Sequence, residues 1–125
     1  MWRKVTVTGT CPTPRAWHSA VAISPIEILI FAGMAGAVTF NDTYIFDICK
    51  YNFVVELILQ ASFGWRRVAT TGTSPSTRQG HSAVVIEDKM YVFGGCNTER
   101  LNDLWILELG MIQFHIVAIR VCFCF

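Results

Sequence analysis

Two histidine–serine pairs have the clearest chemical potential in this sequence, because a histidine can act as a base toward a hydroxyl nucleophile. The pairs are His18–Ser19 and His81–Ser82. Neighbouring residues of a strand point to opposite faces, so each histidine is badly placed to take the proton of the serine that follows it. No third residue that would orient either imidazole is evident. We therefore predict satisfied, partly buried histidines and no catalytic residue.

Arginines are the next candidates for a functional role. Arg15 and Arg78 each stand three residues before a histidine. A guanidinium group is a planar fork of five donors, so we expect it to bind loop carbonyls, with contact to an acidic partner residue as the alternative. Arg66, Arg67, Arg78 and Arg100 could form a basic patch, but the net charge is only +1 and no basic run is interleaved with aromatic residues. We expect no binding of nucleic acid.

The cysteines give no indication of a metal site. Their number is odd, and neither a C-x-x-C pair nor a second spaced histidine completes a zinc pattern. They are Cys11, Cys49, Cys96, Cys122 and Cys124. We predict reduced, buried thiols and no metal or cofactor. The first residues lack the apolar core of a signal peptide, so we expect a cytoplasmic protein, with the nucleus as the alternative.

The candidate residues recur because the sequence repeats itself. WRKVTVTGTCPTPRAWHSAVAI, at residues 2–23, returns as WRRVATTGTSPSTRQGHSAVVI at residues 65–86, with a constant offset of 63. ILIFAG then answers MYVFGG at an offset of 62, and NDTYIFD answers NDLWILE at an offset of 61. Repeats of this kind bury their faces on one another. An active site normally occurs once, so the recurrence favours structural roles.

The repeated runs have the composition of β-strands. SAVAI, ILIFA, TYIFD, SAVVI, MYVFG and DLWILEL are short, rich in β-branched and aromatic residues, and bounded by turn formers. Several are apolar at consecutive positions, which is typical of strands covered on both faces. We therefore predict stacked β-sheets.

The pattern W-x-x-V, G-x-x-P-x-x-R-x-G-H-S, an apolar run ending in Gly-Gly, and then N-D-L resembles the kelch family. The resemblance implies an all-β fold of about two four-stranded antiparallel blades from an incomplete β-propeller. In the kelch order, residues 2–7 and residues from Trp65 onward would be outer strands, and residues 19–23 and 81–86 inner strands. Residues 28–32 would be a middle strand, and residues 102–109 a third strand.

The repeated residues have physical reasons to be structural. Tryptophans fill gaps between blades, and glycines allow positive φ or a close approach of two backbones. Asn-Asp pairs suit the turn before a strand. The structural repeat residues that we predict are Trp2, His18, Gly33, Asp42, Trp65, His81, Gly94, Gly95, Asp103 and Trp105.

Some features depart from the family pattern. Residues 1–109 contain two kelch repeats, at residues 2–47 and 65–109. Residues 48–64 form an apolar insert between the repeats. Either the insert adds a strand or its residues 53–59 are buried elsewhere. The apolar tail at residues 110–125 is atypical, and we expect it to add a strand or pack on the core, with an aberrant coding end as the alternative. It is too short and too polar for a membrane span of about 20 apolar residues. Trp17 and Ala32 replace the glycines of the second repeat, so the turns of the first repeat are expected to differ.

Length limits the architecture, because 125 residues supply about two blades and four is the usual minimum for a propeller. Three explanations remain open: a fragment of a longer kelch protein, self-association through open blade edges, or a compact two-sheet relic. We favour the fragment, followed by the relic.

The resemblance implies a non-catalytic interaction module that presents rim loops to a protein partner. The loops are residues 13–17, 34–40, 76–79 and 96–101, and the expected contact residues are Arg15, Trp17, Arg78, Gln79, Asn97 and Arg100. The alternative is a fragment of a kelch-fold enzyme, either galactose-oxidase-like or sialic-acid-isomerising.

Overall fold

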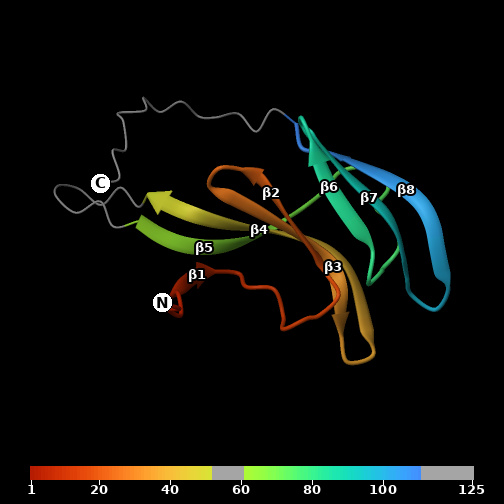
Figure 1. The fold of residues 1–125 in the computed structure, drawn as a ribbon, viewed down its shortest axis with the longest axis horizontal. Coiled ribbons are helices and arrows are strands. Elements are labelled where there is room, and N and C mark those ends of the chain that lie inside the picture. The colour runs from red at the N-terminus through yellow and green to blue at the C-terminus, as the bar shows by residue number, and fades with distance from the viewer. Residues whose placement is uncertain (52–60, 111–125) are drawn as a thin grey trace.

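The computed structural model describes residues 1–51 and 61–110, which form eight strands in two sheets (Figure 1). The strands are β1 (Val7–Gly9), β2 (Ser19–Ser24), β3 (Glu27–Ala35), β4 (Val38–Tyr51), β5 (Ala61–Val68), β6 (Ser82–Ile86), β7 (Lys89–Cys96) and β8 (Arg100–Glu108). The five-stranded sheet has the order β1-β5-β4-β3-β2, and the three-stranded sheet has the order β6-β7-β8. The prediction of an all-β chain is confirmed.

The first blade is the antiparallel set β2-β3-β4-β5. Its inner and middle strands contain the residues expected from the sequence, and β5 contains Trp65 as the outer strand. A β-bulge interrupts the pairing of β3 with β4 between Phe31 and Gly33, so the strand bends just before its end. The flanks of the insert extend β4 to Tyr51 and begin β5 at Ala61, whereas residues 52–60 lie outside the described part of the chain.

The prediction of an outer strand at residues 2–7 was wrong. Residues 2–6 belong to no strand, and β1 pairs in parallel with β5 of the same sheet, with Val7 opposite Phe63 and Gly9 opposite Trp65. A strand can pair only with an unpaired edge of a sheet. The N-terminal segment reaches the edge of β5 that faces away from β4, so β1 pairs there. Trp2 is left fully exposed.

The second blade is the antiparallel set β6-β7-β8. Within residues 1–51 and 61–110, no strand pairs with the outer edge of β8. The tail at residues 111–125, for which we expected a strand or core packing, lies outside the described residues. The second blade therefore has three of its four predicted strands in the described chain.

The core lies between the two blades, because each blade turns one apolar face toward the other. Leu29, Phe31 and Ile45 of the first blade form one buried cluster with Met90 and Val92 of the second. Burying a side chain of this size contributes roughly 1.5–3 kcal/mol, so the contact between the faces holds the blades together.

We predicted strands that are covered on both faces. The middle of β3 is covered in this way, since five consecutive residues are buried, but the second blade is not. On its far face, large apolar side chains are half or more exposed. They are Val84, Ile86, Phe93, Leu104 and Ile106.

Candidate functional site

Arg78 organises the loop that enters the second blade. Its side chain is fully buried, and both of its terminal nitrogens donate to the carboxylate of Asp103, at 2.8 and 2.9 Å. It also donates to the carbonyl oxygens of Gly94 and Ser76. The guanidinium group lowers the pKa of the Asp103 carboxyl well below its usual range, and a hydrogen bond from Trp105 adds to this effect. Arg78 thus ties one loop to two strands of the second blade.

Arg15 does the same in the first repeat. It donates to both oxygens of Asp42 and to the carbonyl oxygen of Ala32. Its guanidinium carbon also lies 4.1 Å from the centre of the Phe40 ring, which adds a cation–π contact. The prediction that these arginines bind loop carbonyls is confirmed, and their acidic partners belong to this chain.

The aspartates of both pairs lie within strands, not in the turns where the sequence placed them. We expected Asp42 and Asp103 to make local turn hydrogen bonds, but each instead receives an arginine that lies more than twenty residues earlier in the sequence. The repeated arginine–aspartate spacing, 27 residues in the first repeat and 25 in the second, was the signal that could have revealed both pairs.

Glycines permit the close approaches at this end of the blades. A Cβ atom on Gly95 would lie 2.7 Å from the carbonyl oxygen of Gln79, and one on Gly33 would lie 2.8 Å from that of Ala16. Both glycines have a positive φ near 95°. Gly94 also has a positive φ, of 63°. Their predicted role, in positive φ and close backbone approach, is confirmed.

Two positions that are glycine in the second repeat have other residues in the first repeat, but the backbone conformation is the same. Trp17 has a φ of 59° where Gly80 has 63°, and Ala32 has 58° where Gly94 has 63°. The expected difference in turn geometry is therefore not found. Surrounding hydrogen bonds hold these residues in the left-handed region at a cost of roughly 1–2 kcal/mol each.

Four loops meet at one rim of the molecule. The loop before β2 bridges the end of β3 through Ala16 and Met34, and the loop before β6 bridges the end of β7 through Gln79 and Cys96. The two entering loops are joined by a hydrogen bond from the Gly80 N–H to the Trp17 carbonyl oxygen, 2.9 Å long. The β3–β4 and β7–β8 hairpins both end on this side of the molecule (Figure 1).

The rim exposes only some of the predicted contact residues. Trp17 is 67% exposed, Arg100 is exposed, and Gln79 and Asn97 are half-buried. Arg15 is nearly buried and Arg78 is fully buried. Neither arginine is available for contact with a partner, because the donors of both side chains bind groups of this chain.

The arginines considered for a basic patch do not gather on this rim. Arg66 pairs with Glu27 and Asp47, at 2.7 and 3.4 Å, near the opposite end of β3. Arg78 is buried, which leaves Arg67 and Arg100 exposed on different strands.

A histidine and a serine do meet, but across the two repeats. Nε2 of His81 lies 2.8 Å from Oγ of Ser19, and the His81 ring packs edge-on against Phe31. Burial, aided by the charge of Arg78, lowers the pKa of His81 to about 4, so the imidazole is neutral at pH 7. Its Nδ1 has no hydrogen-bond partner among the described residues, so nothing orients the ring as a catalytic base requires. The pair joins the blades, and sequence reasoning missed it because it tested each histidine only against its neighbour.

The tryptophans have different surroundings. Trp65 packs against Phe46 with ring centres 4.8 Å apart, and Trp105 donates to Asp103 at 2.6 Å. Trp2 contacts solvent only at its position before β1.

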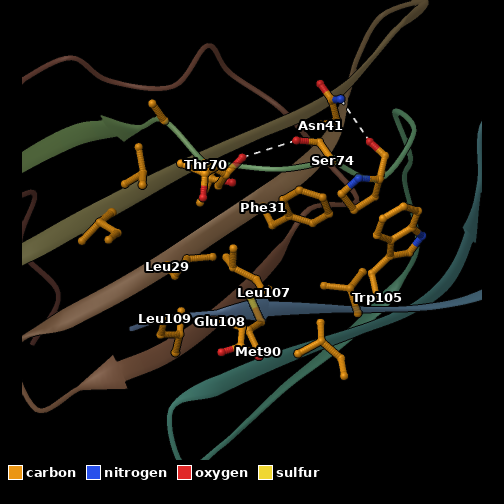
Figure 2. Close-up of a pocket in the computed structure, with 18 of the residues that line it drawn as sticks. Leu29, Phe31, Asn41, Thr70, Ser74, Met90, Trp105, Leu107, Glu108 and Leu109 are labelled. Carbon is orange, nitrogen blue, oxygen red and sulfur yellow. Dashed lines mark hydrogen bonds between the residues drawn. The ribbon is translucent and has the colours of Figure 1, made fainter. Parts of the chain in front are cut away.

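A cavity of about 470 Å³ opens between the blades beside β8. Figure 2 shows the lining residues: β3 supplies Leu29 and Phe31, and β8 supplies Trp105 and Leu107. Thr70 and Ser74 come from the segment that follows β5. Its volume suits a small ligand, and its lining combines apolar side chains with hydroxyl groups.

Other chemistry is not evident in the described part of the chain. Residues 1–51 and 61–110 contain no group of three histidine, cysteine, aspartate or glutamate side chains that could hold a metal. The same residues include no helix long and apolar enough to cross a membrane. Cys96 is half-buried, but Cys11 is exposed, so the expectation of a buried thiol was wrong there.

Comparison with known proteins supports the kelch resemblance. Host cell factor 2 of Homo sapiens is 34% identical over 91% of this chain and 16% of its own length. An F-box/kelch-repeat protein of Arabidopsis thaliana is 37% identical over 86% of this chain and 20% of its own length. The leucine-zipper-like transcriptional regulator 1 homolog of Drosophila melanogaster is 33% identical over 86% of this chain. The match to the Drosophila melanogaster protein covers 11% of that protein's length. The chain therefore spans a fifth or less of each of these relatives.

The family model described as the KLHDC2/KLHL20/DRC7 Kelch-repeats domain matches residues 1–121. The match includes both repeats, and each of the two blades has an arginine–aspartate anchor at its rim. The chain belongs to the kelch-repeat family, and its two sheets are kelch-type blades of an incomplete propeller.

Proposed function

We propose that this chain is a non-catalytic interaction module whose four-loop rim binds a protein partner. The observation that carries the proposal is the exposure of Trp17 on an otherwise rigid rim. Holding a large aromatic side chain in solvent at positive φ costs free energy. Tryptophan and arginine are also the side chains most enriched at the centres of protein interfaces.

The rim has the other properties of a binding surface. Its backbone is fixed by hydrogen bonds between loops, so little conformational entropy is lost on binding. Val38, 57% exposed, adds apolar area, while Glu99 and Arg100 supply charges at the tip of the β7–β8 hairpin. Apolar and charged groups at one rim suit a folded protein or peptide of mixed character.

A comparative capture experiment tests the proposal. We expect immobilised wild-type chain to retain a reproducible set of proteins that a Trp17→Gly, Arg100→Glu double variant loses. Glycine is the residue at the equivalent place in the second repeat, with the same backbone angle, so the variant should fold. Ile26→Ser, which alters an exposed apolar residue at the β2–β3 turn, is the matched control.

Recombinant partner and chain should then bind directly in calorimetry. The double variant should weaken binding by at least tenfold, while the control should leave it unchanged. Equal capture by all three forms would refute a binding role for this rim.

A further inference from the structure

The guanidinium group of Arg78 has two donor edges, and Ser76 lies at one of them. At the first edge, both terminal nitrogens donate to the carboxylate of Asp103. At the second edge, Nε donates to the carbonyl oxygen of Ser76 at 3.2 Å, and Nη2 donates to the Ser76 hydroxyl oxygen at 3.3 Å. Nη1 also donates to the Gly94 carbonyl oxygen, so each of the five N–H donors has an acceptor. The bond to the Ser76 hydroxyl is the longest of the five.

Ser76 is exposed, although the arginine side chain that it contacts is fully buried. It lies in the loop at residues 69–78, which belongs to no strand. A loop outside the sheets can adapt to the active site of a modifying enzyme more easily than a paired strand can. Ser76 is therefore accessible to such an enzyme, and a group added to its hydroxyl would lie beside a fixed cation.

The other hydroxyl groups of this loop have different surroundings. Thr70 and Ser74 bond to each other at 3.3 Å (Figure 2). Thr71 and Thr73 are exposed, and no arginine side chain in the described part of the chain donates to either. The contact with a buried guanidinium thus distinguishes Ser76 from its neighbours.

The same loop joins the two blades through Arg78. Its backbone N–H donates to the Phe40 carbonyl oxygen, and its carbonyl oxygen accepts from the Gly33 N–H, both at 2.9 Å. Phe40 and Gly33 belong to the first blade, whereas the Arg78 side chain binds Asp103 and Gly94 of the second. A charge added next to Arg78 therefore acts on the connection between the blades.

We propose that Ser76 is a phosphorylation site, and that Arg78 receives the phosphate and thereby tightens the connection between the blades. A protein kinase transfers the γ-phosphoryl group of ATP, so that the bond from Ser76 Oγ to phosphorus forms and the bond from that phosphorus to the bridging oxygen of ADP breaks. The hydroxyl proton passes to a base of the kinase, and ADP leaves.

The phosphate changes the second donor edge of Arg78. It adds a charge of about −1.5 to −2 and three strong acceptor oxygens at position 76. Nη2 then donates to a charged oxygen in place of a hydroxyl, and hydrogen bonds of this kind are roughly twice as strong as neutral ones. Because Ser76 is exposed, the remaining phosphate oxygens stay in water.

The phosphate also repels the carboxylate of Asp103, and distance decides which effect is larger. The phosphate is attached at the Nε–Nη2 edge of Arg78, whereas Asp103 occupies the Nη1–Nη2 edge. It therefore lies nearer to the guanidinium than to the carboxylate, and Coulomb energy falls with distance. The Asp103 side chain is 39% exposed, so water screens the repulsion. Attraction to Arg78 is the larger effect.

The first repeat contains the same arrangement in a less suitable form. Thr13 is the counterpart of Ser76, and its hydroxyl accepts from Nη2 of Arg15 at 3.2 Å. The carboxylate of Asp42 is only 13% exposed, so it would repel a phosphate on Thr13 with less screening. We therefore assign the site to Ser76.

Phosphoserine placed at position 76 of the 125-residue chain tests the contact with Arg78. Phosphorus NMR measures the second pKa of the phosphate, which ordinarily lies near 6. In Ser76→phosphoserine we expect this pKa to be lower by about one unit or more than in Thr71→phosphoserine, since a neighbouring arginine favours the more highly charged form. The Thr71 variant is the matched control, because it places the same group in the same loop. Equal pKa values at the two positions would overturn the proposal.

Urea unfolding tests whether the phosphate tightens the connection. The transition midpoint of Ser76→phosphoserine should lie above that of the wild type, while the Thr71 control should leave it unchanged. Asp103→Asn should lower the midpoint of the phosphorylated chain by less than half as much as that of the unphosphorylated chain, because the phosphate remains as a countercharge for Arg78. A lower midpoint with phosphoserine at position 76, or an equal effect of Asp103→Asn in both chains, would contradict the tightening.

Kinase assays test whether Ser76 accepts a phosphoryl group. The folded chain is incubated with magnesium, ATP and a panel of purified serine/threonine kinases, and the modified residues are located by mass spectrometry. We expect phosphate on Ser76, with the site lost in Ser76→Ala and kept in Thr71→Ala. Phosphate at other positions only, or none at all, would refute the assignment of Ser76.

Discussion

The substitution Arg78→Ala tests whether the rim is held by its buried arginine. The change removes five donors from a site with no solvent exposure. Asp103 keeps the hydrogen bond from Trp105 but loses both bonds from Arg78, and the carbonyl oxygens of Gly94 and Ser76 lose the bonds that Arg78 donates. Removing one member of a buried ion pair costs roughly 3–5 kcal/mol. The Asp103 side chain is 39% exposed, so water can solvate part of the stranded carboxylate. We therefore expect the free energy of unfolding to fall by about 3 kcal/mol, at the lower end of that range.

The first repeat offers a matched comparison. Arg15→Ala strands Asp42, whose side chain is only 13% exposed, and it also removes the cation–π contact with Phe40. We expect this substitution to cost more than Arg78→Ala, about 4 kcal/mol. Urea unfolding followed by fluorescence measures both values.

A double-mutant cycle then separates pairing from packing. Arg78→Ala and Asp103→Ala should show a coupling energy of about 2 kcal/mol, since they remove the same pair. Additive effects, or a cost below about 1 kcal/mol for Arg78→Ala, would refute the anchoring role.

Three further predictions follow from local geometry. Gly95→Val should lower the free energy of unfolding, measured in urea, by at least about 2 kcal/mol more than Gly36→Val. Both sites have positive φ, but only at Gly95 would a Cβ atom meet a backbone oxygen, at 2.7 Å. Equal costs at the two sites would contradict this reasoning. Stability should fall as pH decreases from 6.5 toward 4, because the unfolded chain protonates His81 near 6.5 while the folded chain holds its pKa at about 4, so protonation favours unfolding. Thermal melts across this range should flatten in His81→Gln, and an unchanged slope would show that other groups dominate. Trp65→Ala should cost about 2–3 kcal/mol through lost packing, whereas Arg100→Ala should stay within about 0.5 kcal/mol; similar melting temperatures would contradict the difference.

Much of the fold could be predicted because its signals are local and occur twice. Short apolar runs and bounding turn residues indicated strands such as β2 and β7, and the two copies supported each other. The pairing of β1 could not be predicted in this way. Residues 7–9 have no feature that selects β5 over another sheet edge, and the choice depends on which edge is free in the folded chain.

The candidate site was less predictable, since its contacts join residues far apart in the sequence. Glycine positions could be read directly, because positive φ is a property of one residue. The partner of Arg78 lies 25 residues away, and that of His81 lies 62 residues away in the other repeat. Only the topology of the sheets brings these groups together.

The first repeat shows why a sequence change need not change a backbone. Trp17 and Ala32 replace glycines and still adopt positive φ, although each costs roughly 1–2 kcal/mol there. Pairing of Ala16 with Met34 and the bond from Arg15 to the Ala32 carbonyl oxygen offset that cost, because they fix the loop on both sides. The anchored frame therefore tolerates a large side chain where the second repeat has none. Trp17 is consequently presented on a rigid rim at 67% exposure, and this exposure is the reason for proposing a partner surface there.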